Sequence, residues 1–246
     1  MEKFWNDLIS DPIHGDIALR IKDIREKIAN AEEKSPYHQK AHLLLATKTR
    51  TPEEINFAIR CGVRRIGENR VQELLDKYDA IDKEGVEIHF IGALQTNKVK
   101  YIIDKVDMIE SLDRISLAEE IEKQAAKRGK VMKVLCEINI GNEESKSGVK
   151  LEEAEAFIQS VSRFPHIQVC GLMAIPPVLR DNAVQIEYFK KIMDLYIDIS
   201  SKKMDNSAMA ILSIGMSSDF ELAVSCGSTQ VRIGTLAFGQ RVYHNK

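Results

Sequence analysis

The sequence predicts an α/β fold and, within that class, a single closed (β/α)8 TIM-type barrel with an extra N-terminal helix. Eight short apolar segments alternate with amphipathic helical patterns. Strands that alternate with helices pair in parallel, because each helix returns the chain to the same edge of the sheet. The chain has 246 residues, close to the roughly 250 residues of a typical barrel domain. We therefore expect one domain over residues 1–246.

A doubly wound open sheet is the alternative arrangement of the same elements. Such a sheet usually carries a GxGxxG motif after its first strand, where glycines let the backbone approach a dinucleotide. No GxGxxG follows the first apolar segment of this sequence, and no low-complexity segment or long linker indicates a second domain. Both observations favour the barrel.

The first element is an amphipathic helix, in which isoleucines recur at helical spacing from Ile17 to Ile28. The apolar segments that we predict as strands are 42–47, 63–66, 87–92, 107–110, 131–140, 167–174, 208–213 and 229–233. The predicted helices between them are 52–61, 69–83, 96–104, 113–128, 150–163, 181–203 and 217–226. Pro52 lies in a predicted first turn, and Ser218 with Glu221 has the spacing of a capping box.

Composition and charge argue against several classes of function. Lys plus Arg total 35 against 37 Asp plus Glu, so the formal net charge is -2, and a nucleic-acid or acidic-membrane surface has no electrostatic support. No apolar run approaches the roughly 18 residues of a membrane-spanning helix, and the acidic-polar amino terminus does not resemble a secretion signal. We therefore expect a cytoplasmic protein.

The four cysteines, Cys61, Cys136, Cys170 and Cys226, lie far apart in the sequence. They form neither a CxxC pair nor a zinc-like spacing with histidine. Reduced thiols and no metal site are the expectation.

Functional residues of a barrel gather at the carboxyl ends of its strands. Lys48 follows the first predicted strand, in the segment LLLATKTR, and polar or glycine-containing segments follow most of the others. Lys48 is either a solvated charge at a strand end or an amine that faces a pocket.

An anion site is predicted where the last two strands end. Ser217 precedes a predicted helix, and Gly234 and Thr235 open a helical turn. Helix amino termini and glycines let backbone N–H groups approach a phosphate, and barrels often build phosphate sites from these two loops. The alternative is that Ser217 is only a helix cap and Gly234 only a turn residue.

Arg232 lies inside the strand segment VRIG, where a guanidinium group needs a partner to offset its desolvation. A structural ion pair and a nitrogen in the ring of a ligand are the two alternatives. Lys48, opposite an anion site, indicates a Schiff base with a phosphorylated aldehyde or ketone.

At these residues the sequence resembles the pyridoxal phosphate homeostasis proteins, small relatives of the alanine racemase barrel. The resemblance covers nearly the whole chain after Gly15. It is carried by ATKT (46–49), GENRVQE (67–73), HFIGALQTNK (89–98), SLDR (111–114), SKSG (145–148), GLMAIP (171–176), LSIGMSSD (212–219) and GSTQVRIGTLAFGQR (227–241). It implies a fold type III barrel that binds pyridoxal 5'-phosphate (PLP), with residues 1–14 as an extension that is free to be flexible.

The resemblance also implies roles for individual residues. Lys48 would carry PLP as a Schiff base, and Arg232 would face the pyridine nitrogen. The phosphate would bind to Ser217, Gly234 and Thr235. A permanent cation beside the ring nitrogen disfavours its protonation and so weakens the cofactor as an electron sink.

Further residues lie on motifs that the family places around the cofactor. Asn69 and Met173 are expected to contact the ring or its substituents. Lys146 is either a second amine for the cofactor aldehyde or a solvated loop residue. Two positions depart from the common pattern: Thr47 stands where serine is frequent, and Arg50 stands where a second lysine is frequent.

The implied function is a non-catalytic protein that holds PLP, limits the free aldehyde and hands the cofactor to PLP-dependent apoenzymes. An amino-acid racemase is one alternative, but the related racemase takes an acid/base group from an added carboxyl-terminal domain. This sequence ends 11 residues after Thr235, and lack of that dimerising domain favours a monomer. A cofactor-free Schiff-base aldolase is the other alternative.

Overall fold

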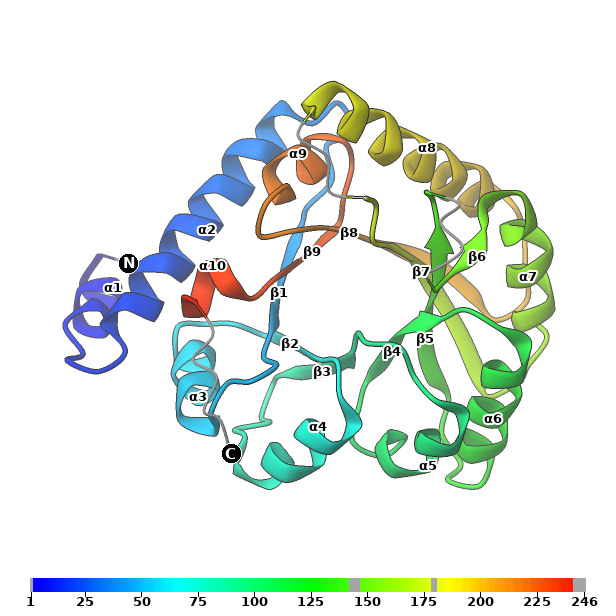
Figure 1. The fold of residues 1–246 in the computed structure, drawn as a ribbon, viewed down its shortest axis with the longest axis horizontal. Helices are drawn as coiled ribbons and strands as arrows, with labels where there is room; N and C mark the ends of the chain where they lie inside the picture. The colour runs from blue at the N-terminus through cyan, green and yellow to red at the C-terminus, as the bar shows by residue number, and fades with distance from the viewer. Residues whose placement is uncertain (1, 142–146, 178–180, 241–246) are drawn as a thin grey trace.

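Eight parallel strands form a closed ring in the computed structural model, which describes residues 2–141, 147–177 and 181–240 (Figure 1). The ring strands are β1 (His42–Ala46), β2 (Arg65–Glu68), β3 (Glu87–Phe90), β4 (Met108–Leu112), β5 (Met132–Asn139), β7 (Ile167–Ala174), β8 (Ser207–Met216) and β9 (Gln230–Ile233). A short strand, β6 (Val149–Lys150), pairs with β5 beside the ring. The predicted closed α/β barrel is confirmed.

The first and last strands of the ring pair with each other. In the parallel ladder of β1 and β9, Leu44 lies opposite Arg232 and Leu45 opposite Ile233. The remaining neighbours pair in parallel as well, including β4 with β5. The residues after β1 and those after β9 therefore meet at the same end of the barrel.

Helices surround the ring of strands (Figure 1). They are α1 (Glu2–Ile9), α2 (Gly15–Lys34), α3 (Pro52–Arg60), α4 (Val71–Lys77), α5 (Val99–Ile102), α6 (Ile115–Ala126), α7 (Ala154–Val161), α8 (Asn182–Ser201), α9 (Phe220–Ser225) and α10 (Thr235–Phe238). Single 3-10 turns occur at Tyr78–Ala80, Thr96–Lys98 and Leu151–Glu153. None of the helices in these described ranges is long and apolar enough to cross a membrane.

The predicted N-terminal helix is α2, which packs against α9 and α10. Its isoleucine stripe is buried, and Ile21 and Ile24 are completely inaccessible. Helix α1 precedes it, and Trp5 of α1 is buried. The spacing of the isoleucines thus fixes which side of α2 faces the barrel.

The strand predicted at 63–66 is observed at Arg65–Glu68. The shift follows from the end of α3, where Gly62 has a positive φ of 85° and the Val63 N–H donates to the Ala58 carbonyl at 3.2 Å. These contacts form a Schellman-type helix end. Val63 therefore belongs to the helix terminus, and Gly67 and Glu68 lie inside the strand.

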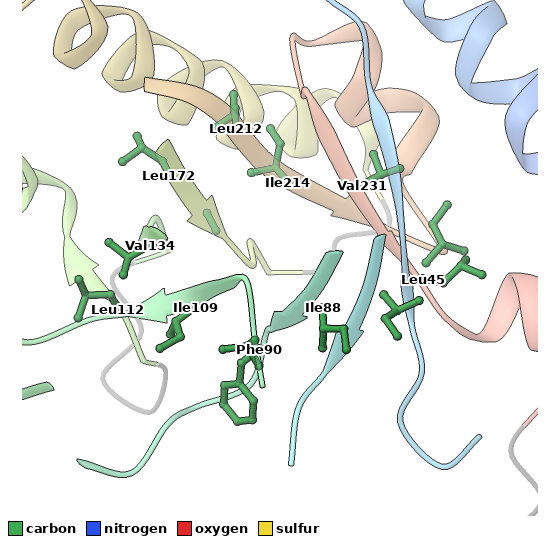
Figure 2. Close-up of a cluster of buried hydrophobic side chains, with 14 of the residues drawn as sticks. Leu45, Ile88, Phe90, Ile109, Leu112, Val134, Leu172, Leu212, Ile214 and Val231 are labelled. Atoms are coloured by element: carbon green, nitrogen blue, oxygen red, sulfur yellow. The ribbon is translucent and has the colours of Figure 1, made fainter. Parts of the chain in front are cut away.

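Apolar side chains pack on both sides of the barrel wall. Strand residues such as Leu45, Phe90 and Ile109 belong to the large cluster that includes the helices (Figure 2). A small separate cluster contains Met108, Leu135, Cys170 and Met173. Alternate residues of a strand point to opposite faces, so these two clusters lie outside and inside the ring.

Replacement of Ile21 tests the contribution of α2 to stability. Ile21→Ala removes a fully buried side chain and is expected to lower the free energy of unfolding by about 2–5 kcal/mol. Leu19→Ala, on the same helix but at a side chain that is 54% exposed, is expected to change it by less than about 0.5 kcal/mol. Urea denaturation followed by circular dichroism measures both. Equal losses in the two variants would contradict the packing of α2.

Candidate ligand-binding site

A cavity of about 630 Å³ opens at the carboxyl ends of the strands. Its described lining residues are Ala46, Lys48, Arg50, Asn69, Ile91, Gly92, Ala93, Glu137, Ile138, Asn139, Ser147, Ile175, Met216, Ser217, Ser218, Arg232, Gly234 and Thr235. Six residues that were singled out in the sequence are thereby brought together: Lys48, Asn69, Ser217, Arg232, Gly234 and Thr235.

A buried ion pair holds the turn that carries Lys48. The Lys77 ammonium lies 2.6 Å from the Glu68 carboxylate and donates to the Thr47 carbonyl at 2.8 Å. The Thr47 hydroxyl also donates to Glu68. Lys77 further approaches the Arg50 carbonyl at 3.4 Å. The backbone on both sides of Lys48 is therefore bound to one buried cation, which limits the movement of this turn.

Arg50 connects the same turn to the last helix. Its guanidinium donates to the carbonyls of Gly239 at 2.8 Å and Phe238 at 3.3 Å, and it lies over the Phe238 ring. These carbonyls are at the carboxyl end of α10, where a cation is electrostatically favourable. The residue that replaces the frequent second lysine thus attaches the Lys48 turn to α10.

The capping box predicted for Ser218 and Glu221 is wrong. Helix α9 begins at Phe220, and Asp219 occupies its N-cap position without a side-chain cap bond. The Asp219 carboxylate instead accepts from the Met216 N–H at 2.7 Å. This contact closes the turn and leaves Ser217 and Ser218 at the cavity wall.

Ser217 and Gly234 lie on the two loops that were predicted to bind an anion. The Leu236 N–H, in the first turn of α10, points to the Ser217 hydroxyl at 3.4 Å. A Cβ on Gly234 would lie 3.2 Å from the Ala46 carbonyl oxygen, so a side chain here would crowd β1. The two loops present a hydroxyl and first-turn amide groups, which are donors suited to a phosphate.

Arg232 is almost completely buried and points along the inside of the barrel. It donates to the carbonyl and the hydroxyl of Ser213, both at 2.6 Å, and to the Ala174 carbonyl at 3.0 Å. Within the described residues its hydrogen bonds go to these oxygens rather than to a carboxylate. Burial lowers the pKa of Arg232, and the charge of Glu110 is the largest effect that opposes this shift.

A polar chain supports Arg232 from inside the barrel. The Ser213 hydroxyl donates to Glu110 at 2.8 Å, and Glu110 also accepts from Gln230 at 2.8 Å and pairs with His89 at 2.5 Å. Burial opposes both charges of the pair, but their mutual hydrogen bond raises the pKa of His89 and lowers the pKa of Glu110. The pair is therefore ionic, and Glu110 supplies negative charge behind Arg232.

Met173 is not among the described residues that line the cavity. It is buried and packs with Met108, Leu135 and Cys170, so its contact with a ligand stays a prediction. Lys146 lies outside the described residues. Asn69 does line the cavity, and no described residue bonds its buried Oδ1 atom.

Glu137 is the main residue that sequence reasoning missed. It lies in β5 and lines the cavity, although it is only 8% exposed. The available signal was a carboxylate within the apolar segment LCEINI. Burying a charged side chain in a strand costs free energy unless a partner compensates it. The same signal drew attention to Arg232.

The site combines an amine, an arginine and two loops with phosphate-type donors in one cavity. This arrangement, at the carboxyl ends of a closed parallel barrel, defines a ligand-binding barrel of the alanine racemase class. The family model described as "Alanine racemase, N-terminal domain" matches residues 20–242.

The chain belongs to the pyridoxal phosphate homeostasis protein family. A protein of that name from Aquifex aeolicus is 45% identical over 225 residues, which cover 91% of this chain and 98% of the relative. A crystal structure of an unknown protein from Bifidobacterium adolescentis is 35% identical, covers 93% of this chain and 97% of that chain, and has a TM-score of 0.85. The structure of PipY from Synechococcus elongatus with PLP bound is 28% identical, covers 87% and 99%, and has a TM-score of 0.75.

Removal of Lys77 tests the support of the Lys48 turn. Lys77→Met leaves Glu68 buried without its cation and is expected to lower the free energy of unfolding by about 3–5 kcal/mol. Adding Glu68→Gln removes the orphaned charge and should restore part of this loss. Lys27→Met, which breaks an exposed pair with Asp23, should cost less than about 1 kcal/mol. Urea denaturation compares the variants, and a Lys77→Met protein as stable as Lys27→Met would refute the role of the buried pair.

Proposed function

We propose that the protein binds PLP in this cavity and holds it as a Schiff base on Lys48, as a carrier that maintains the supply of the cofactor without turnover. The observation that carries the proposal is the convergence of Lys48, Arg232 and the Ser217 and Gly234 loops on one cavity. The name of the Aquifex aeolicus relative and the bound PLP in the PipY structure support it.

The residues of the cavity fit the parts of this cofactor. PLP supplies an aldehyde carbon that an amine can attack. The Lys48 nitrogen forms the new bond to that carbon, and the aldehyde oxygen leaves as water. Ser217 and the backbone of Gly234 and Thr235 bind the phosphate. The orphaned Asn69 Oδ1 atom is an acceptor that a ligand can satisfy.

Arg232 is a reason to expect limited chemistry from the proposed cofactor. Its guanidinium is fixed by Ser213 and Ala174 and stays cationic, so it disfavours a proton on a pyridine nitrogen beside it. Racemisation also requires an acid/base group on each face of the substrate. We extend the proposal to a monomeric, cytoplasmic protein that delivers PLP to apoenzymes.

Borohydride reduction tests the attachment at Lys48. Protein loaded with PLP, reduced and digested is expected to yield a pyridoxyl group on the peptide that contains Lys48, and Lys48→Ala is expected to lose both this adduct and the visible absorbance. Lys40→Ala changes an exposed lysine paired with Glu32 and should keep both signals. Loaded wild-type protein without an adduct on Lys48 would overturn the proposal, and a cofactor-free aldolase would then be favoured.

Turnover assays test the absence of catalysis. PLP-loaded protein incubated with a panel of amino acids is expected to racemise none of them faster than Lys48→Ala does, because a carrier has no acid/base group on each face of the substrate and its unprotonated ring is a weak electron sink. Chiral chromatography measures the products. Reproducible racemisation that depends on Lys48 would replace the carrier by a racemase.

A further inference from the structure

Glu137 is a buried carboxylate at the cavity that no described residue hydrogen-bonds. It is 8% exposed and lines the same cavity as Lys48 and Arg232. The other two buried glutamates of the barrel are bound: Glu68 by Lys77 and Thr47, and Glu110 by His89, Gln230 and Ser213. In the described part of the chain, no side chain or backbone group makes a hydrogen bond to Glu137.

Burial of Glu137 in this environment affects its protonation state. Burial, with a smaller contribution from Asp113, raises the pKa of Glu137 to about 7, and Arg232 acts in the opposite direction. Near neutral pH the side chain therefore exists in substantial part as the neutral acid, which is a hydrogen-bond donor as well as an acceptor. A partnered carboxylate would be only an acceptor.

Few charged residues in the described part of the chain lie near this position. Asp113, after β4, and Arg232, in β9, act on Glu137 electrostatically, and Lys48 and Arg50 line the same cavity. Strand β7 contributes uncharged Met173 at the position opposite Glu137. Glu110, on the neighbouring strand β4, is paired with His89. Arg232 and Asp113 therefore dominate, with opposite effects.

We propose that Glu137 is a further ligand-binding residue, which enters the complex as the neutral acid and donates a hydrogen bond to an acceptor on the cofactor ring. The inference rests on the proposed function. PLP carries a negatively charged phosphate, and its ring offers a phenolic oxygen and an unprotonated nitrogen as acceptors. An ionised Glu137 would repel such a ligand in a desolvated site. The neutral acid instead donates a hydrogen bond to the ring acceptor, which compensates the burial of both groups.

Binding is then linked to a proton on Glu137. Because the complex requires the protonated side chain, the affinity falls as pH rises through the pKa of free Glu137, by about tenfold for each pH unit above it. A residue that only supports the fold would not produce this dependence.

Pyridoxine 5'-phosphate is the probe, because it keeps the phosphate and ring but has an alcohol in place of the aldehyde and cannot react with Lys48. Its dissociation constant is measured by calorimetry between pH 6 and pH 9 for wild type, Glu137→Gln and Glu137→Ala. Glutamine keeps a donor of nearly the same shape and does not titrate. The ionisation of the ligand phosphate affects all three proteins equally and cancels in the ratios.

The expected result is a ratio of wild-type to Glu137→Gln dissociation constants that is flat near pH 6 and rises about tenfold per pH unit above pH 7.5. At pH 6, Glu137→Ala should bind more weakly than Glu137→Gln, which retains the donor. A ratio that does not change with pH, alanine binding as tight as wild type at pH 6, or no binding by wild type would each overturn the inference. The adduct on Lys48 is measured separately, so an intact adduct with a flat ratio defeats this inference alone.

Discussion

Parallel pairing of β1 with β9 is the constraint on which the site depends. It places Leu44 opposite Arg232 and brings the loop after β9 so close to β1 that Gly234 has little room for a side chain beside the Ala46 carbonyl. Lys48 follows one of these strands and Thr235 the other. An amine and a set of phosphate-type donors from opposite ends of the chain thus face one cavity because the barrel closes.

Two buried polar systems then fix the groups that the closure brings together. Inside the ring, the ionic pair of His89 and Glu110 supports Ser213, which in turn holds Arg232. Outside the ring, Lys77 binds the backbone of the Lys48 turn. Buried charges are costly unless they are paired, and each of these is compensated by hydrogen bonds. These hydrogen bonds hold the charged groups in position before a ligand binds.

Glu137 departs from this pattern, since it is buried and makes no hydrogen bond with the residues that the structure describes. Its position opposite the supported Arg232 gives the cavity one fixed cation and one group that can gain or lose a proton near neutral pH. In the complex that we propose, the fixed cation lies beside the ring nitrogen, and the titrating group makes binding sensitive to pH.

The sequence by itself determined the barrel and predicted most residues of the candidate site, because apolar periodicity and strand-end chemistry are local properties. The eight strands and Lys48, Ser217, Arg232 and Gly234 could be predicted in this way. Only the tertiary structure decided which of them meet. It extended β2 to Glu68 through the Gly62 helix end, moved the start of α9 to Phe220, and placed Glu137 in the cavity wall. These features depend on contacts between residues that are distant in the sequence. The local pattern of apolar residues does not predict such contacts.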